Sequence, residues 1–230
     1  MHAKQIAGLI LAINNFSKAV GTTLSEKVDL DSKLVMAWLS YLKSFHLTGV
    51  ADNLILAVES SIRETAACLS LGLVRPALFS LRMEIDLVLA WLYFKDHAVE
   101  WNYVNASGDG FKMKKEILDY LAAHNPRFQA RLSQLKNIKT RIEADPYRLL
   151  SAHIHGQSAV VLPAVHELQD FVRSPEICFD SAAAIFEVSE YINDVLLSMY
   201  VSGWHALPKE ICIALEARFV SPQQQGEFFA

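Results

Sequence analysis

Apolar residues recur every three or four positions over most of the chain, which is the spacing that places side chains on one face of an α-helix. The pattern predicts helices over about residues 3–20, from Asp29 or Asp31 to Gly49, and over about residues 53–71. We expect Gly21 to end the first of them. Short connections between these segments favour antiparallel neighbours in an up-and-down bundle.

A fourth helix, opened by Pro76 and running to Phe94, is apolar nearly all round after Asp86. Such a helix is normally central and covered on every side. Loop residues gather at 106–111, where we expect a hinge or an exposed turn, and the tail at 221–230 should fray. Further helices are predicted at about 112–123, 127–143, 181–202 and 208–219. The sequence thus predicts one all-α domain over residues 1–230.

Composition narrows the class of protein. A hydrophobic fraction of 52% is enough for a sizeable core. The 9 glycines and 7 prolines are too few for the turns that many short strands would require. The net charge of −4 argues against binding of nucleic acid through the overall charge of the protein. Three cysteines lie far apart among apolar neighbours, as in a reduced cytoplasmic protein. Because no segment is typical of a signal peptide or a membrane span, we expect neither export nor membrane insertion.

One short predicted helix, from Asp145 to Gly156, gathers several reactive side-chain types. Asp145 is suited to cap its start, Pro146 fits the first helical position, and Gly156 is suited to end it. The signals at both ends are local, so they define the segment without reference to the rest of the fold.

Within this segment, Arg148 and His155 lie seven positions apart and nearly eclipse at about 100° per residue, with Ser151 between them on the same face. His153 points well away from that face. One interpretation is that these polar side chains are hydrogen-bonded between packed helices and have a structural role. The other is that they form a catalytic site. His153 and His155 diverge by about 160° on a helix, so they are not placed to chelate one metal ion.

Three charges in the predicted central helix, Arg82, Glu84 and Asp86, require partners if they are buried. Arg82 and Asp86 are four apart and are able to pair along the helix, whereas Glu84 needs a partner from another helix. Arg82 and Glu84 would form a buried ion-pair network on one hypothesis. On the other, they steady the face that carries Arg148 and His155.

The segment from Lys112 to Arg148 holds nine basic against four acidic residues, so it carries +5 while the remainder carries −9. A local positive face of this kind is able to hold phosphates even on an acidic protein. The alternative is a solvated, lysine-rich helix surface. If the face binds RNA, we expect its contacts to be Lys136, Lys139 and Arg141.

The sequence contains neither the Gly-x-Ser-x-Gly of a nucleophile elbow nor a phosphate-binding glycine loop. What remains is acid–base chemistry without a metal or another cofactor. A histidine is able to move protons near neutral pH, and an arginine is able to hold a phosphate. RNA cleavage by the neighbouring 2′-hydroxyl needs those two functions.

The segment from Arg148 to His155 resembles the Arg-x4–6-His motif of the HEPN superfamily. The helix with Ser80-Leu-Arg-Met-Glu84 together with the later Tyr147 helix is also similar to uncharacterised bacterial HEPN-like proteins, over about residues 74–200. The resemblance implies a HEPN-like bundle, with extra N- and C-terminal helices, that dimerises so that two motif helices form one cleft.

By this resemblance, Arg148 would stabilise the scissile phosphate and His155, or alternatively His153, would transfer protons. Ser151 would belong to the same catalytic face, and Arg82, Glu84 and Tyr147 would support it. The chain departs from the family at Leu149, where active members often carry a polar residue.

The acid–base pattern together with this resemblance implies a metal-independent endoribonuclease of HEPN type, and the resemblance alone implies a toxin–antitoxin or antiviral defence setting. Its expected partners are RNA, a second copy of the chain, and an antitoxin or sensor protein. The alternative hypothesis is a catalytically inactive helical bundle that binds a protein or a nucleotide through the same face.

Overall fold

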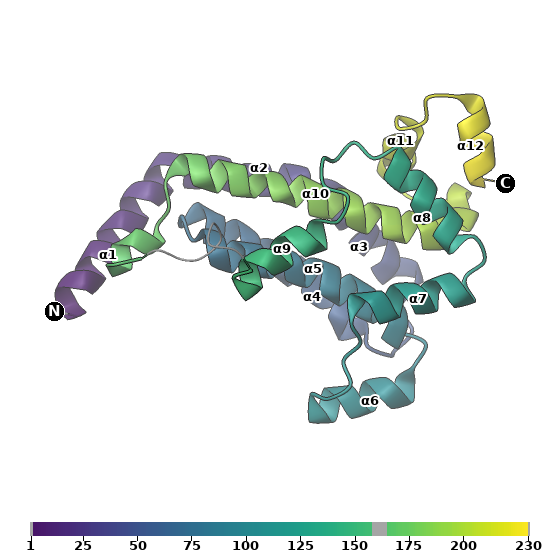
Figure 1. Cartoon of the computed structure of the whole chain (residues 1–230), viewed down its shortest axis with the longest axis horizontal. Helices are drawn as coiled ribbons and strands as arrows, with labels where there is room; N and C mark the ends of the chain where they lie inside the picture. The colour runs from purple at the N-terminus through teal and green to yellow at the C-terminus, as the bar shows by residue number, and fades with distance from the viewer. Residues whose placement is uncertain (1, 158–164, 230) are drawn as a thin grey trace. The chain divides into compact units, whose positions relative to one another are not determined.

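The computed structural model describes residues 2–157 and 165–229, and within these ranges every regular element is a helix (Figure 1). The prediction of an all-α helical bundle is confirmed. The α-helices are α1 (His2–Phe16), α2 (Thr22–Asp31), α3 (Lys33–Phe45), α4 (Asp52–Ser70), α5 (Val74–Phe94), α6 (Ala98–Ser107), α7 (Lys114–His124), α8 (Phe128–Asn137), α9 (Pro146–His155), α10 (Pro175–Tyr200), α11 (Lys209–Glu216) and α12 (Pro222–Phe229). Short segments of other helix types are the π-helix η1 (Ser17–Gly21) and the 3-10 helices η3 (Leu168–Phe171) and η4 (Val201–Ala206).

The chain divides into two compact units, both of which include parts of α4, α5 and α10. Unit 1 comprises Met1–Ser32, Ser60–Glu84 and Asp145–Val188, and unit 2 comprises Lys33–Glu59, Ile85–Ala144 and Ser189–Ala230. The loop expected at 106–111 forms between α6 and α7, inside unit 2. Among the described helices, none combines the length and the apolar character needed to cross a membrane.

In unit 1, Gly21 does not end the first helix as the sequence predicts. The chain passes from α1 through the π-helical turn η1 directly into α2, and Gly21 itself has a helical φ of −58°. A Cβ at Gly21 would lie 2.9 Å from the backbone oxygen of Ser70, and the Ser70 hydroxyl donates a hydrogen bond to the Gly21 carbonyl at 3.0 Å. The glycine therefore permits a close approach to α4 and does not act as a helix stop.

In unit 2, the second half of α5 is the covered helix that its composition predicts. Every residue from Val88 to Phe94 is buried. The indole of Trp38 on α3 is also buried, and its Nε1 donates a hydrogen bond to Asn193 Oδ1 on α10 at 2.8 Å. The core of this unit thus combines apolar packing with a satisfied polar contact.

Helices α8, α10 and α12 differ from the sequence-based expectation. The second basic helix, α8, ends at Asn137 instead of about residue 143, and α10 begins at Pro175 instead of about residue 181. The tail at 221–230, where we expected fraying, instead forms α12 over Pro222–Phe229. Burial explains the last difference, because Phe228 is fully buried and its ring lies 5.5 Å from that of Phe219.

Candidate functional site

Helix α9 has the boundaries that its local signals predict. Asp145 occupies the N-cap position, where its carbonyl accepts the backbone N–H of Arg148 at 3.1 Å, and Pro146 begins the helix. Gly156 ends it with φ +58°, in the left-handed region that favours glycine. The backbone N–H groups of Gly156 and Gln157 both donate to the Ala152 carbonyl at the end of the helix.

Arg148 and His155 are exposed on α9, while Ser151 and His153 are half-buried. Within residues 2–157 and 165–229, neither the Arg148 nor the His155 side chain forms a hydrogen bond or an ion pair. The described residues therefore do not form a buried contact in which the side chains of Arg148, Ser151 and His155 are hydrogen-bonded to one another. A guanidinium and an imidazole on the same face of α9 are both open to solvent.

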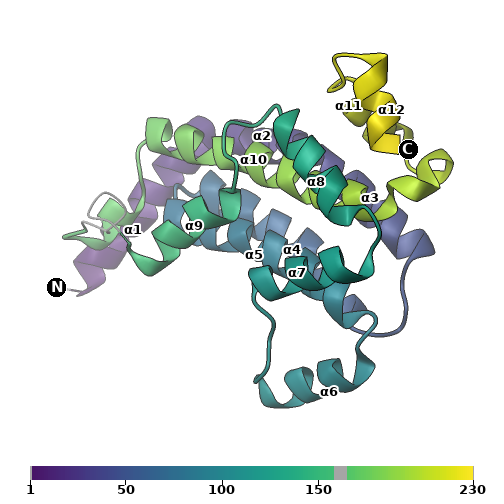
Figure 2. The ribbon, with the colours of Figure 1, turned by 45° about the vertical axis from the view of Figure 1, so that its right-hand side comes forward.

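Arg82 of α5 joins this helix to the rest of unit 1. Its Nε donates a hydrogen bond to Ser151 Oγ at 3.1 Å, and its terminal nitrogen Nη2 donates another to the Tyr147 hydroxyl. Its guanidinium carbon also lies 4.5 Å from the centre of the Tyr147 ring, a cation–π distance. Two views place α9 alongside α5 (Figures 1 and 2). Arg82 thus fixes two points of α9 that are four residues apart.

A second arginine, Arg75, contacts the other end of α9 and was not identified from the sequence. Its Nη2 donates a hydrogen bond to the Ile154 carbonyl at 3.4 Å. Burial lowers the pKa of His153, and the positive charge of Arg75 lowers it further. His153 is therefore biased towards the neutral imidazole, the form that accepts a proton.

Glu84 of α5 is bound by a residue of α4. Its side chain is 2% exposed, and Thr65 donates a hydrogen bond to its Oε1 at 3.5 Å. Burial raises the pKa of Glu84 well above the ordinary value of 4.5, and the weaker opposing effect of Thr65 does not cancel this. Glu84 is thus a buried carboxyl group hydrogen-bonded within unit 1.

The raised pKa of Glu84 predicts a pH-dependent stability. Between about 4.5 and the raised folded pKa, the folded state holds a proton that the unfolded chain has released. The stabilisation is complete below about pH 4.5 and is lost as the pH rises through the folded pKa, at about 1.4 kcal/mol per pH unit. Urea unfolding should show Glu84→Gln equal to the natural protein near pH 4 and more stable than it near pH 8. Identical pH profiles for the two proteins would contradict the prediction.

The structure corrects the role expected for Arg141 as an exposed RNA contact. Arg141 is 3% exposed, and its guanidinium pairs with Glu190 at 3.4 Å and with Asp194. Its backbone N–H and that of Thr140 also donate to the Glu190 carboxylate, at 2.6 and 2.8 Å. These contacts hold residues 140 and 141 against α10, which accounts for the early end of α8.

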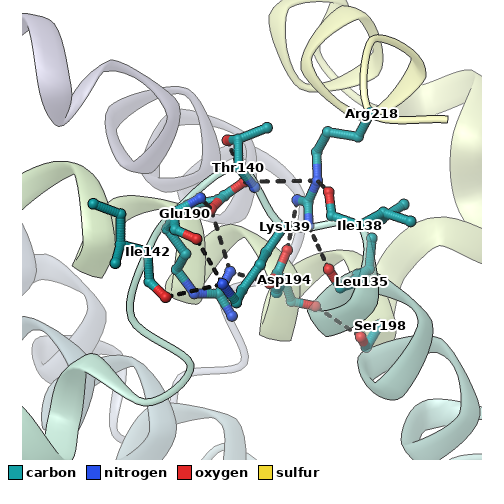
Figure 3. Close-up of polar contacts among 10 residues, drawn as sticks. Leu135, Ile138, Lys139, Thr140, Ile142, Glu190, Asp194, Ser198 and Arg218 are labelled. Carbon is teal, nitrogen blue, oxygen red and sulfur yellow. Dashed lines mark hydrogen bonds and ion pairs between the residues drawn. The ribbon is translucent and has the colours of Figure 1, made fainter. Parts of the chain in front are cut away.

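Arg218 completes this buried ionic cluster in unit 2 (Figure 3). It pairs with Asp194 at 2.6 Å and with Glu190 at 3.6 Å, and its Nη2 donates to the Leu135 carbonyl at 2.8 Å. Two arginines and two carboxylates therefore neutralise one another in the core. The sequence offered one signal for the cluster, namely two acidic residues four positions apart on an apolar helix.

Lys136 and Lys139 have different surroundings, although both belong to unit 2. Lys136 is exposed in the last turn of α8. Lys139 is half-buried and donates hydrogen bonds to the carbonyls of Arg141 and Ile142, at 2.7 and 2.9 Å. Of the three predicted phosphate contacts, Lys136 alone extends freely into solvent.

In the part of the chain that the structure describes, no group of three His, Cys, Asp or Glu side chains is arranged to hold a metal ion. Comparison with known proteins adds no relative: no family model, no curated protein and no solved structure matches the chain. The candidate site is therefore argued from its own residues, which are Arg148 and His155 at the surface of α9, with Arg82, Tyr147 and Ser151 behind them.

Proposed function

We propose that the protein is a metal-independent endoribonuclease of HEPN type, in which Arg148 and His155 act on the RNA backbone. The observation that carries the proposal is the joint exposure of these two side chains on one face of α9. A structural arginine and histidine on a packed helix would instead be paired or covered.

The proposed reaction is attack of a ribose 2′-hydroxyl on the adjacent phosphorus, which forms a P–O2′ bond and breaks the P–O5′ bond. Arg148 holds the non-bridging phosphate oxygens and stabilises their charge in the transition state. The imidazole of His155 moves a proton, either from the 2′-hydroxyl or to the leaving 5′-oxygen. His153, with its lowered pKa, is the alternative base.

Arg82 has a positioning role in this scheme. By binding Ser151 and Tyr147, it fixes the face of α9 that presents Arg148 and His155. A reactive constellation must be held within a fraction of an ångström, and packing of a short helix alone supplies this poorly. The Ser151 hydroxyl, which accepts from Arg82, belongs to the support and not to the proton transfers.

We also propose that the active form is a homodimer, with α9 of each copy contributing to one cleft. Support comes from apolar side chains exposed in unit 1 on the two helices that Arg82 joins. Phe79 and Met83 on α5 are 38% and 49% exposed, and Leu149 on α9 is 38% exposed. Exposed apolar groups of this size are typical of surfaces that a partner covers. The toxin–antitoxin or antiviral setting, with an antitoxin or sensor partner, is proposed from the HEPN resemblance alone.

Leu149 favours a second candidate function. It directly follows Arg148 and presents an apolar surface where an active member of the family often has a polar group. In this candidate the protein is a catalytically inactive bundle, and Arg148 and Leu149 together contact a protein or a nucleotide.

Incubation of the purified protein with total RNA in EDTA separates the two candidates. The nuclease proposal predicts cleavage that resists the chelator and leaves 2′,3′-cyclic phosphate ends. Binding of RNA without cleavage would favour the inactive module, and cleavage that EDTA abolishes would contradict the metal-independent mechanism.

A further inference from the structure

Helix α8 in unit 2 carries an unusual concentration of buried polar atoms without partners. Eight side-chain atoms of the described residues are buried and lack a hydrogen-bond partner. Three of them belong to residues at or near the first two turns of α8, namely Arg127 Nη1, Arg131 Nε and Gln134 Oε1. Such atoms are rare in folded proteins, and an ion or water that completes their bonding is a common explanation.

Arg131 is the most unusual of the three, because it is a buried cation without an anionic partner among the described residues. It is 7% exposed, and its one hydrogen bond to a described side chain runs from Nη1 to Ser202 Oγ at 3.2 Å. No carboxylate of the described residues pairs with it, in contrast to Arg141 and Arg218 in the same unit. Burial lowers the pKa of Arg131, and the charge of Arg127 lowers it further.

Arg127 adds a second guanidinium one helical turn before Arg131. Its Nη2 donates a hydrogen bond to the Glu227 carbonyl of α12 at 2.7 Å, while Nη1 has no partner among the described residues. Arg127 occupies the N-cap position of α8 with φ +69°, a backbone conformation that costs energy for a residue with a side chain. The two arginines also lie at the positive end of the helix dipole, where cations are unfavourable.

We propose that Arg127 and Arg131 bind a phosphate group at the first turn of α8. A phosphate carries close to two negative charges near neutral pH and so matches two guanidinium groups. Its oxygens accept the forked N–H donors of arginine, including Arg131 Nε and Arg127 Nη1. The N-terminal turn of a helix favours an anion at this place. The site lies in unit 2 and does not depend on the proposed chemistry of α9.

Thermal unfolding of the full chain with added phosphate tests the proposal. Inorganic phosphate at about a hundredfold excess over its Kd should raise the Tm by roughly 5–10 °C relative to chloride at matched ionic strength. Adenosine 5′-monophosphate provides the second arm. A response to both ligands assigns the site to phosphate in general, and a response to the nucleotide alone assigns it to a nucleotide phosphate. No response to either beyond that of chloride would overturn the proposal.

Substitution at Arg131 locates the response. Arg131→Met should abolish the phosphate-dependent rise, and in phosphate-free buffer it should unfold at or above the Tm of the natural protein, because an uncompensated buried charge is removed. Lys209→Met, which removes an exposed cation of the same unit, should keep the full response. If Arg131→Met fails to fold, Arg127→Gln replaces it and should weaken phosphate binding at least tenfold. A response that survives in the folded variant would overturn the assignment.

Discussion

Arg148→Ala and His155→Ala are each expected to lower RNA cleavage by about a hundredfold to ten-thousandfold, the usual contribution of one acid–base or charge-stabilising group. Both side chains are exposed and form no hydrogen bond or ion pair with a described side chain, so we expect their removal to leave the packing of unit 1 intact. We expect the Tm of both variants to stay within a few degrees of that of the natural protein. Cleavage of a labelled RNA and thermal unfolding provide the two readouts.

Matched substitutions separate this effect from a general loss of charge. His205→Ala and Lys209→Ala remove an exposed histidine and an exposed lysine of unit 2, and both variants should cleave RNA at the natural rate. His153→Ala identifies the histidine that transfers the proton, since a loss there with full activity in His155→Ala would move the role to His153. If Arg148→Ala and His155→Ala both unfold, the face is structural and the enzyme proposal fails.

The largest effect on stability is expected from Asp194→Ala in unit 2. Asp194 is fully buried and pairs with both Arg141 and Arg218, so its loss leaves two buried guanidinium groups with Glu190 as their one carboxylate in the cluster. Breaking a buried ion pair by removing one partner typically costs about 3–5 kcal/mol. Urea unfolding should detect a decrease of this size in the free energy of unfolding.

Asp119→Ala is the control for this substitution. Asp119 forms an exposed pair with Lys115, four residues before it on α7, and such surface pairs contribute about 0–1 kcal/mol. The control should therefore unfold close to the natural protein. A decrease for Asp194→Ala no larger than that of the control would mean that the two arginines find other partners or water.

The features that the sequence predicted well depend on signals only a few residues apart. Pro146 and Gly156 mark the two ends of α9 because the fixed φ of proline and the left-handed conformation of glycine act within one turn, whereas the Asp145 side chain occupies the N-cap position without the capping hydrogen bond that the sequence predicts. The apolar run of α5 likewise predicted its burial without reference to any other helix.

The features that were missed depend on contacts between distant parts of the chain. Gly21 has the composition of a helix stop, but its proximity to Ser70, 49 residues later, decides its role. Arg75 contacts Ile154 across 79 residues, and Arg141 finds Glu190 across 49. A single sequence does not show which of its many charged residues will meet in the fold. Arg141 was therefore predicted to lie on an exposed basic surface.

The buried pairing of Arg141 changes how this protein should respond to salt. An arginine already paired in the core cannot neutralise an RNA phosphate and release the counterion condensed there, so it contributes nothing to the ionic-strength dependence of RNA association. Each phosphate contact adds about 0.7 to the slope for a single strand, and the basic segment should therefore give a shallower slope than its formal charge implies. The formal charge of +5 for the segment from Lys112 to Arg148 therefore overstates the positive electrostatic potential that an RNA chain would meet there.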